Sequence, residues 1–142
     1  MIVEINSEAG ILRATSVMNA LRPQLNVENI VPILLKMMQN GYHLIGYEAD
    51  GVIAAALGYR FTEHLHWGKA IYIDDLTTIE AYRKRGFACK LLDHVKTVAL
   101  AHQCNQIHLD SGLGANRYDA HRFYLNYGFN ITSHHFAMAL NK

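Results

Sequence analysis

Apolar and polar residues along the chain alternate first with the spacing of a strand and then with that of a helix. Residues 1–6 alternate one by one, which predicts a short strand. Apolar residues then recur every three or four positions over residues 11–21, which predicts a helix, and Pro23 ends it. A second stripe over residues 27–38 predicts another helix.

Two residues suggest where that second helix begins and ends. Asn29 is a good N-cap, and a cap there would place Pro32 in the first turn, where a missing N–H does little harm. Gly41 is a natural stop, because glycine readily adopts the left-handed conformation that closes a helix.

The middle of the chain is strand-like. The pattern predicts strands over residues 42–49, 52–61 and 70–78, and residues 61–68, which are polar and aromatic, should form a loop or the ends of strands. Asp50 and Gly51 separate the first two strands and are typical of a tight hairpin turn.

The last third returns to alternating elements. We expect a helix from about Gly86, a strand over residues 106–110, a loop over 112–115, a helix from the N-cap Asn116 to Gly128, and one or two strands over 129–140. The whole order predicts an α/β fold, with a central mixed, mostly antiparallel sheet and about four flanking helices. A length of 142 residues without repeat or linker suggests a single domain, residues 1–142.

Composition narrows the possible partners and location. The formal net charge is +1, so no broad field favours nucleic acid or an anionic membrane. The apolar runs are too short to cross a bilayer, and the first residues do not resemble a signal peptide. Cys89 and Cys104 do not suggest a disulfide framework, so we expect a cytoplasmic protein.

One basic segment lies directly before a predicted helix. Its residues are Arg83, Lys84, Arg85, Gly86, Phe87 and Ala88. Positive charge at a helix N-terminus opposes the helix dipole, by about 0.3–1 kcal/mol per exposed charge, and an anion would resolve that conflict. The small residues Gly86 and Ala88 would let a pyrophosphate approach the backbone. A solvated basic turn is the alternative that charge and glycine alone leave open.

The spacing Arg83-x-x-Gly86-x-Ala88 resembles the Gln/Arg-x-x-Gly-x-Gly/Ala signature of the GNAT superfamily of acyl-CoA-dependent N-acetyltransferases. Residues 71–78 resemble the family's fourth strand. A later pattern also matches, Asn-x3-Ala-x3-Tyr-x3-Gly-Phe, at Asn116, Ala120, Tyr124, Gly128 and Phe129. The resemblance covers nearly the whole chain, and Ala88 departs from it slightly, because glycine is commoner there.

The resemblance implies a role for each matching position. It implies that the backbone of Arg83–Ala88 holds the pyrophosphate of acetyl-CoA, which is a co-substrate, and that the backbone of Leu76, Thr77 and Thr78 pairs with the pantetheine arm where the fourth and fifth strands splay apart. It also implies that Asn116 touches the cofactor near its thiol and that Tyr124 is the general acid. No metal is expected.

The base is left open between two adjacent aspartates. Asp74 and Asp75 should face opposite sides of their strand, so that one faces the substrate cleft. A carboxylate there could bind an ammonium or deprotonate it through water, and position in the resemblance slightly favours Asp74.

Other residue groups suggest weaker alternatives. His64 with His66, and His134 with His135, lack the acidic or cysteine partners of a metal site. A hydrolase site at His108, Asp110 and Ser111 would need a nucleophile elbow that the sequence lacks. One of His64, His108 or His135 could still line the acceptor pocket.

The expected function is transfer of acetyl from acetyl-CoA to a primary amine of a small molecule or peptide, by direct attack in a ternary complex. The alternatives are a non-catalytic acyl-CoA sensor of the same fold and an acyltransferase with a different acyl group. The last strands, with their aromatic and apolar residues, could pair in a homodimer.

Overall fold

The computed structural model describes residues 1–141 and divides into two compact units, which are described separately. The first unit is residues 1–109, and the second begins at Asp110. The expectation of a single domain over residues 1–142 stays a prediction. None of the helices in the described residues combines the length and apolar character of a membrane span.

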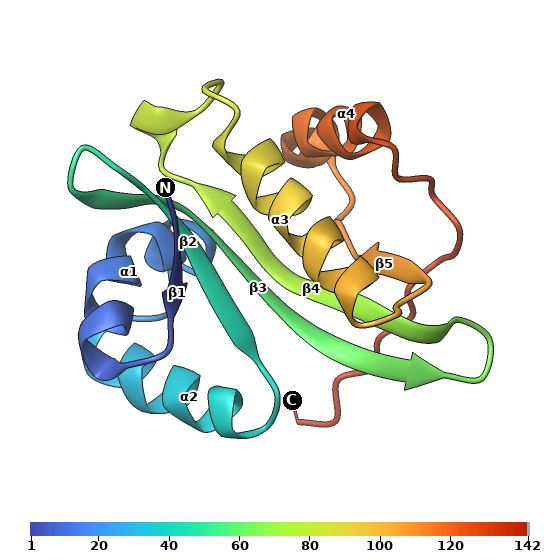
Figure 1. The fold of residues 1–142 in the computed structure, drawn as a ribbon, viewed down its shortest axis with the longest axis horizontal. Helices are drawn as coiled ribbons and strands as arrows, with labels where there is room; N and C mark the ends of the chain where they lie inside the picture. Colours follow the sequence, from blue (N-terminus) through green and yellow to red (C-terminus); the bar gives the residue numbers. More distant parts are fainter. Residues whose placement is uncertain (142) are drawn as a thin grey trace. The chain divides into compact units, whose positions relative to one another are not determined.

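The first unit holds a sheet and three α-helices (Figure 1). In chain order its elements are β1 (Ile2–Ile5), α1 (Glu8–Leu21), α2 (Val27–Gln39), β2 (His43–Ala49), β3 (Val52–His64), β4 (Gly68–Thr78), the 3-10 helix η1 (Glu80–Tyr82), α3 (Phe87–Ala101) and β5 (Gln106–Leu109). The second unit holds the 3-10 helix η2 (Ala115–Arg117) and α4 (Tyr118–Tyr127).

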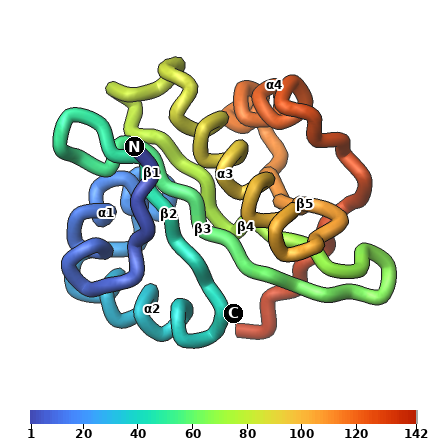
Figure 2. Tube along the Cα trace, in the orientation of Figure 1, coloured from blue at the N-terminus to red at the C-terminus, as the bar shows by residue number. Residues whose placement is uncertain are grey.

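The five strands lie in the order in which they occur along the chain. Strands β1 to β4 pair antiparallel, and β5 pairs parallel to β4 after the crossover through α3. Strands β2, β3 and β4 can be followed side by side in the trace of Figure 2. The mixed, mostly antiparallel sheet and the four α-helices expected from the sequence are therefore confirmed.

Helices cover both faces of this sheet. One core joins α1 and α2 to alternate strand residues; it includes Ile11, Val17, Ile30, Leu34, Leu44, Ile53 and Ala56. On the opposite face α3 contacts β3 and β4, and the buried residues there include Leu57, Ile71, Ile73, Leu91, Leu92 and Val95. Each buried valine, leucine or isoleucine side chain stabilises the fold by about 1.5–3 kcal/mol relative to exposure.

The predicted start of the second helix was wrong by three residues. Asn26, not Asn29, is the N-cap: its side chain accepts from the Asn29 N–H at 3.0 Å. The Asn29 side chain accepts in return from the Asn26 N–H at 2.8 Å, so the two residues form a capping box. Pro32 therefore lies inside the helix rather than in its first turn, and its ring is on the exposed side.

Residues 61–68 were predicted to form a loop or the ends of strands, and most of them are strand ends of a hairpin. Strand β3 continues to His64, because residues 61–64 have cross-strand partners in β4, ending with His64 opposite Gly68. Backbone pairing thus outweighs the polar character of the segment, and only residues 65–67 turn. The Asp50–Gly51 turn is confirmed, with both residues at positive φ (53° and 78°).

Two predictions in the C-terminal part were also wrong. Asn116 lies within η2 rather than capping α4, whose N-cap is Arg117. No strand forms over residues 129–141, and the alternating side chains of Phe136, Met138 and Leu140 are 91%, 85% and 86% exposed. Alternation favours a strand only where a neighbouring strand and an apolar layer are available, and the described residues provide neither for this segment.

Candidate active site

The second half of β4 has one free edge. Pairing between β4 and β5 extends only from Ala70 opposite Gln106 to Ile73 opposite Leu109, where β5 ends. Strand β4 continues to Thr78 and pairs there with β3 alone. Within the part of the chain that the structure describes, no strand pairs with the other edge of residues 74–78, and an unpaired strand edge is where an extended ligand can add.

A β-bulge lies at the start of this free segment. Gly58 of β3 pairs with Asp75 and Tyr59 pairs with Ile73, which leaves Asp74 as the extra residue. A bulge interrupts the alternation of side chains along a strand. The prediction that Asp74 and Asp75 face opposite sides was therefore wrong: both carboxylates bond groups beside Tyr42, on the face of the sheet that α1 and α2 cover.

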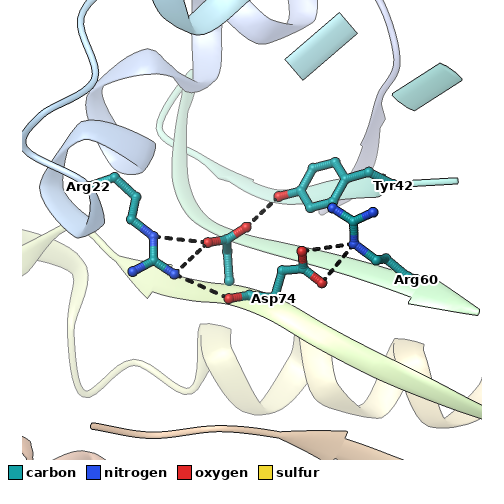
Figure 3. A network of polar contacts seen from close by, with 5 residues as sticks. Arg22, Tyr42, Arg60 and Asp74 are labelled. Carbon is teal, nitrogen blue, oxygen red and sulfur yellow. Dashed lines mark hydrogen bonds and ion pairs between the residues drawn. The ribbon is translucent and has the colours of Figure 1, made fainter. Parts of the chain in front are cut away.

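Asp75 is held by two neighbours. Arg22, the C-cap of α1, donates to Asp75 Oδ1 from Nε at 3.2 Å and from Nη2 at 2.9 Å. The Tyr42 hydroxyl donates to Asp75 Oδ2 at 2.8 Å. Arg22 Nη2 also reaches the Asp74 carbonyl at 3.3 Å, as Figure 3 shows. With both oxygens bonded and the side chain only 10% exposed, Asp75 fastens the end of α1 to the bulge.

Asp74 has a different partner. Arg60 of β3 donates from Nε to both carboxylate oxygens of Asp74, at 3.2 and 2.9 Å (Figure 3). Burial raises the pKa of the Asp74 carboxyl above its ordinary value, and the Arg60 hydrogen bond and charge oppose that rise. A carboxyl whose pKa is raised by burial is a better proton acceptor than one in water, provided that it is ionised at the working pH.

The three partner residues Arg22, Tyr42 and Arg60 were not singled out as site residues from the sequence. One signal was available in Gly58, because a glycine inside a strand often marks a bulge or a close approach. Burial raises the pKa of the Tyr42 hydroxyl strongly, with Asp75 adding to the effect, so Tyr42 stays a neutral hydrogen-bond donor.

The basic segment forms the start of α3. Gly86 is its N-cap at φ 81°, and Lys84 two residues earlier has φ 64°. No side chain caps the first amides of α3, and a Cβ built on Gly86 would meet no atom within 4 Å. Turns that contain left-handed residues can direct successive N–H groups to one side and form a concave anion site. The segment predicted to bind a pyrophosphate therefore has suitable unpaired donors and open space beside Gly86.

Aromatic contacts hold this segment against the sheet. Phe87 stacks on Tyr47 of β2 with ring centroids 4.3 Å apart, and Lys90 Nζ donates to the Tyr47 hydroxyl at 3.1 Å. The Arg85 guanidinium lies 4.9 Å from the Tyr82 ring centroid. Arg83 turns back to the free end of β4, where its Nε donates to the Thr78 carbonyl at 3.3 Å. The segment is thus tied to the strand that carries Leu76, Thr77 and Thr78.

Tyr124 and Asn116 belong to the second unit. Tyr124 lies on the aromatic stripe of α4, in edge contact with Phe123 and Phe129. Burial raises the pKa of the Tyr124 hydroxyl, and Arg117 opposes the rise. The hydroxyl is therefore protonated at neutral pH, as a proton donor must be. Asn116 is exposed in η2.

The histidines are engaged mainly with aromatic neighbours. His64 and His66 lie against Trp67, which stacks on His108 with centroids 3.4 Å apart. His135 lies 3.5 Å from Asp110. Among the described residues, no group of three histidine, cysteine, aspartate or glutamate side chains is arranged to hold a metal ion.

Comparison with known proteins gives the context for this geometry. The model of the acetyltransferase (GNAT) family matches residues 15–129. The chain is 33% identical over 122 residues to the uncharacterized N-acetyltransferase YhdJ of Bacillus subtilis, covering 84% of each protein.

Solved structures share the fold. A putative acetyltransferase from Agrobacterium tumefaciens superposes with a TM-score of 0.82 at 18% identity, over 98% of this chain and 99% of that one. The aminoglycoside N-acetyltransferase AAC(6')-Iy, in complex with a bisubstrate analogue of CoA, superposes with a TM-score of 0.84 at 14% identity, over 100% and 98% of the chains. The family match spans most of the chain and includes both the β4 segment and the α3 N-terminus, and the chain belongs to the acetyltransferase (GNAT) family.

Proposed function

We propose that this protein transfers the acetyl group of acetyl-CoA to a primary amine of a small molecule or peptide. The observation that carries the proposal is the pairing of two features in the first unit. The first amides of α3 have no side-chain cap and lie next to the open space beside Gly86, and Arg83 ties that turn to the free edge of β4. The amides at the start of α3 suit a pyrophosphate, and the free edge of β4 suits an extended chain that contains amide groups.

In this proposal the amides of Arg85–Ala88 and the cations around them hold the pyrophosphate. The pantetheine arm, which carries two amides, lies along the backbone of Leu76, Thr77 and Thr78 as an added strand. A complex of AAC(6')-Iy with CoA has also been solved, with a TM-score of 0.83 to this chain at 14% identity, which supports a fold that accommodates such a molecule.

The chemistry needs a free amine. Asp74 takes a proton from the acceptor ammonium, directly or through water, and the neutral nitrogen then attacks the thioester carbonyl carbon. A backbone N–H of the free β4 edge stabilises the oxyanion. The C–S bond breaks as the amide forms, and the nitrogen loses its second proton to solvent, from which the general acid regains the proton that it gives to the thiolate. Acetyl-CoA and amine therefore give amide and CoA without a covalent enzyme intermediate.

The departing thiolate needs a proton. We assign this step to the Tyr124 hydroxyl, whose raised pKa keeps it protonated, and place Asn116 near the thiol. Asp75 acts differently from Asp74 in this proposal: bound to Arg22 and Tyr42, it supports the site and takes no proton.

A homodimer is part of the proposal. The exposed, alternating side chains of Phe136, Met138 and Leu140 would be covered if the C-terminal segments of two copies paired. Light scattering after gel filtration measures this directly. A mass equal to twice that of the chain is expected, and a monomer at micromolar concentration would rule the dimer out.

Release of free CoA thiol from acetyl-CoA tests the function. The panel of acceptors spans polyamines, amino acids, aminoglycosides and short peptides. We expect at least one amine to stimulate release, and Tyr124→Phe to lower turnover on that amine by about 10²–10⁴-fold, because it removes the hydroxyl and keeps the ring. Gly86→Glu adds bulk and negative charge at the anion site and should abolish the rise in melting temperature that CoA gives the native protein.

The possible outcomes distinguish the proposed function from its alternatives. A rise in melting temperature with CoA but no amine-dependent release would favour an acyl-CoA sensor. Faster release from succinyl-CoA or a longer acyl-CoA would keep the enzyme and change the acyl group. An unchanged CoA response in Gly86→Glu would refute the pyrophosphate site.

A further inference from the structure

The ring of Tyr42 occupies the space that Gly58 leaves above β3. A Cβ at Gly58 would lie 1.8 Å from the Tyr42 hydroxyl oxygen and 2.3 Å from the ring carbon that bears it. Gly58 is also the residue opposite Asp75, beside the bulge that makes Asp74 the extra residue. Tyr42 is only 2% exposed. Its ring therefore has one place to lie, directly over the bulge.

Arg60 lies on this ring. Its guanidinium carbon is 5.5 Å from the Tyr42 ring centroid, so the guanidinium is supported by a cation–π contact. From that place its Nε donates to both oxygens of Asp74, as seen in Figure 3. An arginine side chain has several rotatable bonds, and contact with a rigid buried ring removes much of that freedom.

We propose that Arg60 and Tyr42 are positioning residues, which together fix the orientation and the charge state of the Asp74 carboxylate. The ring of Tyr42 holds Arg60, and Arg60 holds Asp74. The catalytic meaning of this arrangement rests on the proposed function, in which Asp74 is the base, but the arrangement itself can be tested in the protein without substrate.

Four groups face Asp74 from the elements around it. Arg60 belongs to β3 and Asp75 to β4. Arg22 lies at the end of α1, and Tyr42 directly precedes β2. Arg60 and Arg22 lower the pKa of Asp74, with Arg60 the larger influence, and Asp75 raises it. Removing the charge of Arg60 should therefore move the titration of Asp74 upward more than removing the charge of Arg22.

Carboxyl-carbon NMR titration of the apo protein measures the midpoint of the Asp74 titration. The protein is labelled at aspartate, and the Asp74 signal is assigned by its absence in Asp74→Asn. We expect Arg60→Gln to move the midpoint of Asp74 to higher pH, and Tyr42→Leu to move it in the same direction because Arg60 loses its support. Arg22→Gln is the matched control, with equal charge lost from the same network, and should shift Asp74 less.

Arg60→Lys provides a conservative variant. It keeps the charge and should return the Asp74 midpoint toward the wild-type value, so a variant that merely disturbs folding is distinguished from one that changes the charge. An Asp74 midpoint unchanged in Arg60→Gln, or shifted as far by Arg22→Gln, would overturn the proposal whatever the enzyme's activity.

The catalytic consequence is tested separately with the amine that the panel identifies. The acidic limb of the kcat/KM profile should move to higher pH in Arg60→Gln, with a severalfold loss below the limb and little loss well above it. A loss that is equal at every pH, together with the shifted NMR midpoint, would leave the positioning of Asp74 intact and refute its role as the base.

Discussion

At the scale of single residues, Asp74 and Asp75 show how the hydrogen-bond partners of a carboxylate determine its role. Asp75 bonds Arg22 and Tyr42 through its two oxygens, which hold its side chain in place. Asp74 is 21% exposed, is gripped from one side by Arg60 and has a raised pKa. Two adjacent residues of the same type therefore differ: Asp75 supports the structure, whereas Asp74 is placed to accept a proton.

The raised pKa of Asp74 predicts a pH dependence of stability. A carboxyl with a higher pKa in the folded than in the unfolded protein favours folding most at low pH, and that contribution is lost as the pH rises through the folded pKa. The free energy of unfolding of the native protein, minus that of Asp74→Asn, should therefore decrease as the pH rises above about 4, the ordinary pKa of an aspartate. Urea denaturation across this range measures it. A difference that increases with pH would mean that Arg60 lowers the pKa more than burial raises it.

Gly58 gives a prediction about packing. Gly58→Ala should destabilise the protein by about 1–3 kcal/mol, because its Cβ would collide with the buried Tyr42 hydroxyl and force the ring away from Asp75. Gly112→Ala is the control, since its Cβ would lie 3.8 Å from the nearest atom. Equal unfolding free energies for the two variants would contradict the tight fit of Tyr42 over the bulge.

At the scale of elements, local signals located most of the helices and strands. The Asp50–Gly51 turn, the stop at Gly41 and the start of α3 at Gly86 follow from the backbone that glycine and aspartate permit. The length of β3 did not follow, because residues 61–64 are strand only through their partners in β4. The sequence of a segment alone does not reveal strand pairing that depends on a segment elsewhere in the chain.

The start of α3 makes an element-scale prediction. Gly86 and Lys84 both have positive φ, a conformation that costs a residue with a side chain about 1–2 kcal/mol. Gly86→Ala should thus destabilise the protein by about 1 kcal/mol although the space beside it is open, whereas Lys84→Gly should keep or raise its stability. Thermal unfolding should give a lower melting temperature for Gly86→Ala and an unchanged or higher one for Lys84→Gly. Equal losses would indicate that the side chain of Lys84, rather than its strained backbone, matters for the fold.

Lys84→Gly should also weaken CoA binding, because it removes a cation beside the proposed phosphate site while leaving the amides in place. More stability with less affinity is the behaviour expected of a residue held in strain for a ligand.

At the scale of the whole molecule, the sequence predicted the fold class and the family but not the contacts that define the site. Residue spacing identified the basic turn, the β4 segment and Tyr124, all within the part that the family model matches. Gly58 was a signal for a bulge in this region, but its position at Asp74 could not be predicted, because it depends on the register between two strands. Arg22, Tyr42 and Arg60 come from three different parts of the chain and meet only in the folded sheet.

The most direct test of the central claim is transfer of label. The protein is incubated with acetyl-CoA labelled with ¹³C in its acetyl group and with the amine panel, and the products are examined by mass spectrometry. The account predicts labelled acetyl on the nitrogen of at least one amine, formed together with free CoA and lost in Tyr124→Phe. CoA binding without labelled amide from any amine, or label found on the protein as a required intermediate, would contradict direct transfer.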